Sequence, residues 1–367
     1  MKDVRVERLA RLICRYSIGV KKGDAIVISG EPVADPLAEE LYREVLRCGG
    51  HPILEVTPGW MQEIYFREAK PHQLDYLSPY GKFEAENARA RILIKATSNT
   101  RRNSNVDAKK MAKSQVARRP ILETFFGRMA KNEWTFMIAP YPTEADAQEA
   151  DMSLADYEDF VFGALLVNKR DPIEEWKKVS KKQALLATKF NRFKDLRIVG
   201  EDTDLRMSVK GRKWVNCDGH HNLPDGEIFS GPVEDSVEGT IRYTYPAIYQ
   251  GREVTDVRLT FKKGVVVKAT AAKGEDLLVK LLAMDEGARR VGEVAVGTNY
   301  GISEFTRSIL FDEKIGGSVH LAVGRSIPES GGLNQSGLHW DMIKDMRKGG
   351  EIYGNGKLVY KNGKFLI

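Results

Sequence analysis

A histidine and an aspartate stand two positions apart near the end of this 367-residue chain, in the run SGLHWDMI. His339 and Asp341 are separated only by Trp340, and in an extended strand residues i and i+2 point to the same face. An imidazole and a carboxylate on one face could hold a metal ion, orient a catalytic water, or hydrogen-bond each other. The rest of the sequence has to decide between these three.

Other isolated acids and one more imidazole lie in apolar, strand-like sequence of the same half: Glu227 in LPDGEIFSGP, Glu293 in RRVGEVAVGTN, and Glu313 and His320 in FDEKIGGSVHLAVG. Burying a lone carboxylate is costly unless it is paired or bound to a cation. Four carboxylates and two imidazoles without an arginine cluster therefore suggest a cation site. Oxygen and imidazole ligands suit Zn, Co or Mn, as one ion or as a pair. Taken singly, each Glu is more simply a solvated strand residue, and no HExxH motif is present.

The composition is that of a folded globular protein, with 42% hydrophobic and 29% charged residues, and the length suits two domains. The run MKDVRVERLARL is charged throughout, unlike a secretory signal, and the longest apolar run, FVFGALLV, is too short to cross a bilayer. Cys14, Cys48 and Cys217 form no CxxC pair, so we expect neither disulfides nor a thiolate metal site. A cytoplasmic protein without a membrane partner is expected.

Basic residues gather at 101–120 and 174–197, and the net charge is +6. A nucleic-acid partner is conceivable on charge alone. Acidic residues are nearly as numerous, however, and no nucleic-acid-binding motif is present, so solvated helix faces are the simpler interpretation. We therefore expect no nucleic-acid partner.

The first half of the chain alternates between apolar strands and helical segments. The strands are expected at 24–30, 51–58, 89–98 and 133–142. This alternation predicts β-α-β units and a doubly wound, mostly parallel sheet. No GxGxxG or P-loop follows any of the strands, so nucleotide binding gains no support.

Near residue 190 the sequence pattern changes to short β-type runs with frequent turns. The chain ends in a hairpin pattern with Asn-Gly turns at 355 and 362. The sequence therefore predicts an α/β domain over residues 1–190 and a β-rich α+β domain over residues 191–367 that carries the metal ligands.

Several separated motifs follow one another along the chain: GVKKGDAIVISGEPVADPLAEELYREVLRCGGHPIL, YPTEADAQEADMSLADYEDFVFGA, NLPDGEIFSGPVEDSVEGTI, GEVAVGTN, LFDEKIGGSVHLAVGR and HWDMI. In this order they resemble the aminopeptidase T family of metallopeptidases, and the resemblance covers essentially the whole chain. It implies a cytoplasmic exopeptidase, usually a homodimer, that removes N-terminal residues from peptides. It also implies two divalent metal ions in the C-terminal domain.

Carried over one position at a time, the resemblance implies six metal ligands, which are Glu227, Glu293, Glu313, His320, His339 and Asp341. Glu293 and Asp341 are the better candidates for bridging the ions, since a carboxylate can offer one oxygen to each. Glu313 is either a ligand or the base that passes a proton to the leaving amine. Two ions about 3.5 to 4 Å apart share a hydroxide and polarise the scissile carbonyl. Acidic residues would hold the free α-amino group of the substrate.

The sequence departs from the family pattern near His320. Family members commonly place a tyrosine seven residues after this histidine to stabilise the transition state, and here Ile327 stands at that position. The spacing from Glu313 to His320 also differs by two residues from a shorter family form. Either another donor such as Tyr300 replaces the phenol, or hydrolysis is weak, or the metals serve another reaction. The alternative function is a metal-bearing peptide-binding homologue with little or no hydrolysis.

Overall fold

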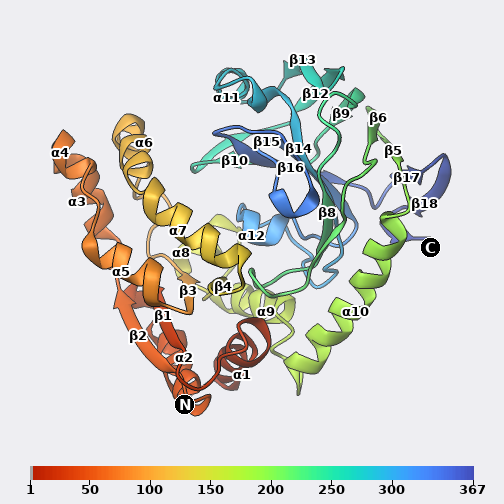
Figure 1. The fold of residues 1–367 in the computed structure, drawn as a ribbon. Helices are drawn as coiled ribbons and strands as arrows, with labels where there is room; N and C mark the ends of the chain where they lie inside the picture. Colours follow the sequence, from red (N-terminus) through yellow and green to blue (C-terminus); the bar gives the residue numbers. More distant parts are fainter. Residues whose placement is uncertain (1–2) are drawn as a thin grey trace. The chain divides into compact units, whose positions relative to one another are not determined.

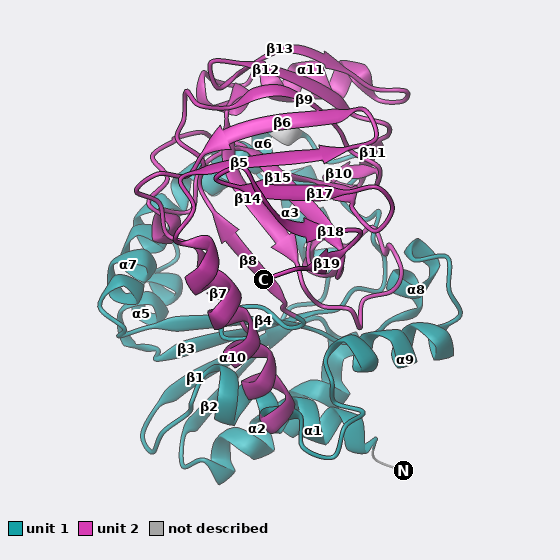
Figure 2. Cartoon of the chain, turned by 90° about the vertical axis from the view of Figure 1, so that its right-hand side faces the viewer, with its two compact units in different colours: residues 1–173, 219–224 teal, residues 174–218, 225–367 magenta. Residues whose placement is uncertain are grey.

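The structure is a computed structural model that describes residues 3–367, and it divides into two compact units. Unit 1 comprises the chain up to residue 173 together with 219–224, and unit 2 comprises 174–218 and 225–367 (Figure 2). Helix α10 (Pro172–Phe190) lies almost wholly in unit 2, because Leu186, Ala187 and Phe190 are buried in the core of that unit. The sequence predicted two domains that meet near residue 190, and that boundary stays a prediction.

Unit 1 is built on a four-stranded, all-parallel sheet in the order β2-β1-β3-β4 (Figure 1). The chain runs outward from β1 to β2 and then crosses back to β3 and β4, so right-handed crossovers place helices on both faces. The predicted α/β fold with a parallel sheet is confirmed. The strands are β1 (Ala25–Gly30), β2 (His51–Val56), β3 (Ala90–Lys95) and β4 (Thr135–Pro140), and the helices are α1 (Val4–Leu12), α2 (Asp35–Arg47), α3 (Trp60–Glu68), α4 (Pro71–Leu74), α5 (Pro79–Asn87), α6 (Ala108–Ala117), α7 (Arg119–Ala130), α8 (Glu144–Glu149) and α9 (Leu154–Ala164).

Local signals in the sequence set the ends of these helices. The Ser153 hydroxyl accepts a hydrogen bond from the Asp156 backbone N–H at 3.2 Å and donates to its carboxylate at 2.7 Å, which opens α9 as a capping motif. Helix α2 stops before Gly49, whose φ of +83° is a left-handed conformation that favours glycine.

The segment 219–224 returns to the edge strand of the unit 1 sheet. The Ile138 N–H donates to the His221 carbonyl and the Leu223 N–H donates to the Ile138 carbonyl, both at 2.9 Å. The His221 ring also stacks on Phe136, with ring centroids 5.0 Å apart. These contacts explain why six residues between two parts of unit 2 belong to unit 1.

Unit 2 is β-rich, and its strands pair with one another in antiparallel fashion. An eight-stranded sheet has the order β13-β12-β9-β6-β5-β17-β18-β19, a five-stranded sheet has the order β16-β15-β14-β8-β7, and β10 pairs with β11. The predicted β-rich α+β character is confirmed. The strands are β5 (Asp195–Gly200), β6 (Thr203–Ser208), β7 (Val215–Cys217), β8 (Glu227–Ser230), β9 (Glu238–Arg242), β10 (Ala247–Tyr249), β11 (Arg252–Val254), β12 (Arg258–Lys262), β13 (Val265–Thr270), β14 (Val291–Gly297), β15 (Ser318–Gly324), β16 (His339–Asp345), β17 (Glu351–Gly354), β18 (Lys357–Lys361) and β19 (Lys364–Phe365), with helices α11 (Glu275–Leu282) and α12 (Ile309–Asp312).

The two predicted Asn-Gly turns close the last strands. Asn355 and Gly356 connect β17 to β18, Asn362 and Gly363 connect β18 to β19, and all four residues have positive φ. That conformation matches the twist of a two-residue hairpin. Within residues 3–367, no helix has the length and hydropathy needed to span a membrane.

Candidate metal centre

Four neighbouring strands of the five-stranded sheet carry five of the six predicted ligands. Strand β8 begins with Glu227, β14 carries Glu293, β15 carries His320, and β16 carries His339 and Asp341. The predicted strand around His339 and Asp341 is confirmed, and alternation puts both on one face. Antiparallel pairing therefore brings together residues that lie far apart in the chain.

The register surrounds the ligands with small residues. Ala322 lies opposite both Glu293 and Asp341, Ala295 lies opposite His320, and Gly297 lies opposite Glu227. Residues directly opposite each other in a sheet share a face. The acidic and imidazole side chains consequently have alanine and glycine as cross-strand neighbours. These small residues leave room for ions between the ligands.

A β-bulge in β14 sets the direction of Glu293. The pairing with β15 shifts between Val291 and Glu293, so that Gly292 is the extra residue. A Cβ added at Gly292 would lie 2.3 Å from the carbonyl oxygen of Gly324. Only glycine allows so close an approach of the two backbones.

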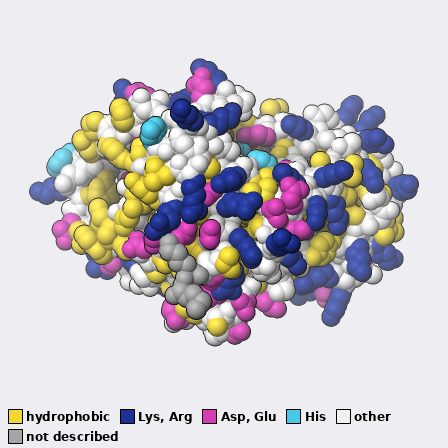
Figure 3. All heavy atoms as spheres, turned by 90° about the horizontal axis from the view of Figure 1, so that it is seen from below, with side chains coloured by type: hydrophobic (Ala, Val, Ile, Leu, Met, Phe, Trp, Pro, Cys, Tyr) yellow, Lys and Arg dark blue, Asp and Glu magenta, His cyan; other side chains and the backbone are white. Residues whose placement is uncertain are grey.

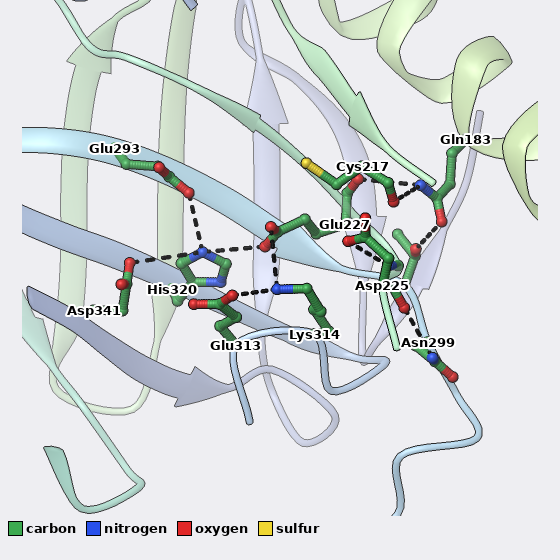
Figure 4. A network of polar contacts seen from close by, with 12 residues as sticks. Gln183, Cys217, Asp225, Glu227, Glu293, Asn299, Glu313, Lys314, His320 and Asp341 are labelled. Atoms are coloured by element: carbon green, nitrogen blue, oxygen red, sulfur yellow. Dashed lines mark hydrogen bonds and ion pairs between the residues drawn. The ribbon is translucent and has the colours of Figure 1, made fainter. Parts of the chain in front are cut away.

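Three carboxylates converge on the Nε2 atom of His320 (Figure 4). The distances are 3.3 Å to Glu227 Oε2, 3.3 Å to Glu293 Oε1 and 3.9 Å to Asp341 Oδ1. His320 is completely buried, and Glu227 and Glu293 are nearly so. The centre of the cluster is thus a buried imidazole enclosed by negative charge.

His339 stands at the solvent side of the cluster, with 32% of its side chain exposed. Its Nδ1 lies 2.8 Å from the Arg325 carbonyl oxygen, which can only accept, so Nδ1 carries the proton. The Nε2 atom faces Asp341 Oδ2 at 3.4 Å and Glu293 Oε2 at 3.9 Å. This backbone contact fixes the ring and leaves Nε2 as the nitrogen available to a metal ion.

Glu313 follows helix α12 and is paired with its neighbour Lys314. The Lys314 side chain is fully buried, and its Nζ atom also lies 3.6 Å from Glu227 Oε1. Glu313, His320 and Asp341 each offer a ligand atom within a common 4.8 Å, as do Glu227, Glu293 and His320. All six predicted residues therefore lie in one cluster.

The charges in this cluster shift the pKa values of its members strongly. Burial lowers the pKa of His320, but the carboxylates around it, Glu227 foremost, outweigh this and raise the pKa to about 10. Burial raises the pKa of Glu227 to about 8 despite Lys314 and His320. Burial also acts to raise the pKa of Asp341, but His339 brings it down to about 2. Such opposed shifts are typical of functional sites.

The carboxylates fit divalent metal ions because their hydrogen bonding is incomplete. Glu227 Oε2, Glu293 Oε2 and Asp341 Oδ1 are buried and have no hydrogen-bond partner. A buried carboxylate oxygen without a partner is costly, and a divalent cation removes that cost. Carboxylate oxygens with imidazole nitrogens are a donor set suited to Zn, Co or Mn.

Sequence reasoning missed two neighbours of the cluster. Lys314 is visible as the lysine of FDEK, but a lysine is seldom buried, and nothing in the local pattern predicts that it would be. Cys217 lies with Asp225 and Glu227 in a third group of possible ligand atoms. Burial raises the pKa of the Cys217 thiol well above its ordinary value, so the thiolate that binds metals is disfavoured.

The hydroxyl of Tyr300, one candidate to replace the missing family tyrosine, has another partner. It donates a hydrogen bond of 2.6 Å to the Gly363 carbonyl. Ile327 is half-buried in the loop after β15, ahead of a short 3-10 turn. Neither residue gives the cluster a phenol donor in this structure.

Comparisons with known proteins identify the family of this chain. A family model described as thermophilic metalloprotease (M29) matches residues 2–365. Aminopeptidase AmpS of Bacillus subtilis is 26% identical, with 98% of each chain covered. The solved structure of wild-type AmpT from Thermus thermophilus superposes with a TM-score of 0.86, at 22% identity and 99% coverage of each chain.

A second solved structure has a similar fold but a name that refers to another reaction. The 2,5-dihydroxypyridine dioxygenase of Pseudomonas putida has a TM-score of 0.59 at 12% identity, over 98% of this chain and 96% of that one. Its name refers to a different chemistry, so the fold does not decide the reaction. The family match does, and since it covers nearly the whole sequence, this chain belongs to the M29 family of metalloproteases and is a metal-dependent peptidase, as the resemblance predicted.

Proposed function

We propose that this metallopeptidase is an aminopeptidase that removes N-terminal residues from peptides with the help of two divalent metal ions. The observation that carries the proposal is the convergence of three carboxylates and two imidazoles on one face of a sheet with Glu313 beside them, where three buried oxygens have no hydrogen-bond partner. When bound, the ions supply an activated water and polarise the scissile carbonyl. Zn, Co and Mn all suit the donor set.

The proposed roles of the residues follow from their positions. Glu293 and Asp341 each face both histidines, so each can offer one oxygen to either ion. His320 holds the centre, and the His339 ring is held by the Arg325 carbonyl. Glu313 is less buried than Glu227 or Glu293, and its carboxylate either completes the ligand set or accepts a proton and passes it to the leaving amine.

The acidic side chains of the cluster favour an exopeptidase over an endopeptidase. The free α-amino group of a peptide is a cation near neutral pH, and acidic side chains beside the ions attract it. An internal peptide bond presents no such charge. The proposed substrate is therefore a peptide with an unblocked N-terminus.

Metal analysis and a substrate panel test this proposal together. The purified chain is assayed for bound Zn, Co and Mn, and aminoacyl chromogenic substrates are offered with and without chelator. We expect bound metal, hydrolysis that chelator stops, and no hydrolysis of the matching N-acetylated substrates. Cleavage of acetylated substrates at the same rate would contradict the exopeptidase assignment.

The alternative is a metal-bearing peptide-binding protein with little hydrolysis. It is favoured by Ile327, which has no hydrogen to donate, and by the engagement of the Tyr300 hydroxyl with Gly363. Retention of peptides by the metal-loaded protein without cleavage would support it. A cytoplasmic location and the absence of a nucleic-acid partner remain predictions of the sequence.

A homodimer is also proposed, because unit 1 exposes many large hydrophobic side chains. Figure 3 shows hydrophobic side chains gathered at the left of the face seen from below. Residues of unit 1 that are more than half exposed include Trp60, Tyr76, Tyr80, Phe83 and Phe126. Contiguous exposed apolar surface is typical of protein interfaces.

Light scattering on the protein as it elutes from a gel-filtration column tests whether it is a dimer. We expect twice the chain mass of 41.2 kDa, and a shift toward the monomer in Phe83→Asp. A monomeric wild-type protein at micromolar concentration would contradict the proposal.

A further inference from the structure

The strongest feature that the proposed mechanism leaves unused is the ammonium group of Lys314. Its side chain has no exposed surface, and it is paired with Glu313 while Nζ lies 3.6 Å from Glu227 Oε1. A buried lysine is rare, and it is kept in the interior only by compensating negative charge. Figure 4 shows Lys314 pointing at the two glutamates beside His320.

The ammonium contacts two of the six proposed ligands and not the other four. Glu227 and Glu313 already contact a cation, namely Lys314. The other four residues form no ion pair with Lys314: Glu293 and Asp341 lie 3.3 to 3.9 Å from the histidine nitrogens, and Glu227 keeps one oxygen 3.3 Å from His320 Nε2. These four form a complete donor set for one divalent ion.

Electrostatics makes the two sets unequal. Four carboxylates and one ammonium carry a formal charge of −3 when the imidazoles are neutral. One divalent ion reduces this charge to −1, so a second ion must enter beside a fixed positive charge that already contacts Glu313 and Oε1 of Glu227. Without the ammonium the two ions would balance the four carboxylates. The repulsion is strong because the group is buried, where charges are poorly screened.

We propose that Lys314 is a built-in competitor for the second metal ion, so that the chain binds one divalent ion tightly through Glu293, His320, His339 and Asp341 and a second ion weakly at Glu227 and Glu313. The weak ion binds only when the ammonium is displaced from the two glutamates. This inference rests on the proposed function, and it adds that occupancy of the second position, and with it two-metal hydrolysis, depends on the metal concentration.

Isothermal titration of the full, chelator-treated chain with Mn²⁺ alone tests the proposal. For the wild-type protein we expect one tight ion and a second that binds at least tenfold more weakly. In Lys314→Met the charge is lost at similar side-chain length, and the second ion should bind at least tenfold more tightly than in the wild-type chain. Lys314→Arg keeps the charge and should keep the two affinities unequal.

Lys344→Met is a matched control. Lys344 is also a fully buried lysine of unit 2, but its Nζ donates to the carbonyls of Glu201 and Arg242 rather than to the proposed ligands. Its loss should leave both Mn²⁺ affinities unchanged. Should Lys314→Met fold only with metal present, metal analysis after gel filtration replaces the titration and should find two ions per chain, with Lys314→Gln as a second neutral variant.

The outcomes separate this inference from the proposed function. Two ions of equal affinity in the wild-type chain, or a second affinity unchanged in both Lys314→Met and Lys314→Gln, would overturn the role of Lys314 and leave the aminopeptidase proposal standing. Absence of any bound Mn²⁺, or bound ions without hydrolysis of unblocked peptides, would instead overturn the proposed function.

Discussion

His339 and Asp341 illustrate how little separates a structural pair from a functional one. Two residues apart in β16, they contact each other, with Nε2 of His339 3.4 Å from Oδ2 of Asp341. Yet the Nδ1 proton of His339 is directed to the Arg325 carbonyl, and Oδ1 of Asp341 is buried with no hydrogen-bond partner. Both features leave an atom available to a metal ion.

Removing either member of this pair should remove metal. We expect His339→Ala and Asp341→Ala to lower the metal content found by elemental analysis and to abolish peptide hydrolysis. Circular dichroism should be unchanged in the far ultraviolet, because neither residue belongs to a hydrophobic core. His72→Ala, an exposed histidine of unit 1, is the control. Full metal occupancy in both variants would refute the ligand assignment.

Ile327 allows a gain of function to be tested. Removing one oxyanion donor typically costs about a hundredfold to a thousandfold in turnover. We therefore expect weak native hydrolysis and a measurable increase in kcat for Ile327→Tyr if the phenol reaches the ions. Tyr300→Phe should change little, because its hydroxyl donates to Gly363. High native turnover that collapses in Tyr300→Phe, with no gain in Ile327→Tyr, would favour Tyr300 as the donor.

At the scale of the elements, the bulge at Gly292 is the feature on which the direction of Glu293 depends. Gly292→Ala should lower the free energy of unfolding by about 1–3 kcal/mol, because the added Cβ meets the Gly324 carbonyl. The metal content of this variant should fall as well, because the shifted backbone would turn the Glu293 carboxylate away from the other ligands. Gly127→Ala in α7 is the control, because its Cβ would meet nothing within 4 Å. Unaltered denaturant midpoint and metal content in Gly292→Ala would contradict this account.

Much of this element-level organisation could be predicted from the sequence. Apolar runs and the Asn-Gly pairs act locally, so the four strands of unit 1 and the last hairpins were found where expected. Isolated acids and imidazoles in apolar runs pointed to the six residues, the resemblance implied that they are ligands, and the structure brings them together. The return of 219–224 to the β4 edge, the shift at Gly292 and the burial of Lys314 depend on contacts between distant segments, which no local pattern encodes.

At the scale of the whole molecule, metal binding should stabilise the chain. Any ligand that binds only the folded state adds free energy by mass action, about 2.7 kcal/mol when its concentration is a hundred times its dissociation constant. We expect chelator to lower the thermal unfolding temperature of the wild-type protein, and added Mn²⁺ or Zn²⁺ to restore it. In Asp341→Ala neither treatment should have an effect. If chelator left the unfolding temperature of the wild-type protein unchanged, the cluster would be stable without ions.

The antiparallel sheet that gathers the ligands also affects the rates of folding and unfolding. The first proposed ligand stands at position 227 and the last at 341, and the strands between them must pair before a complete donor set exists. Contacts between such distant positions form slowly. A metal ion that needs the finished sheet interacts little with the transition state, so it slows unfolding far more than it accelerates folding. The centre would then act as a clasp on the folded enzyme, lengthening its lifetime at high temperature without helping it to reach the native state.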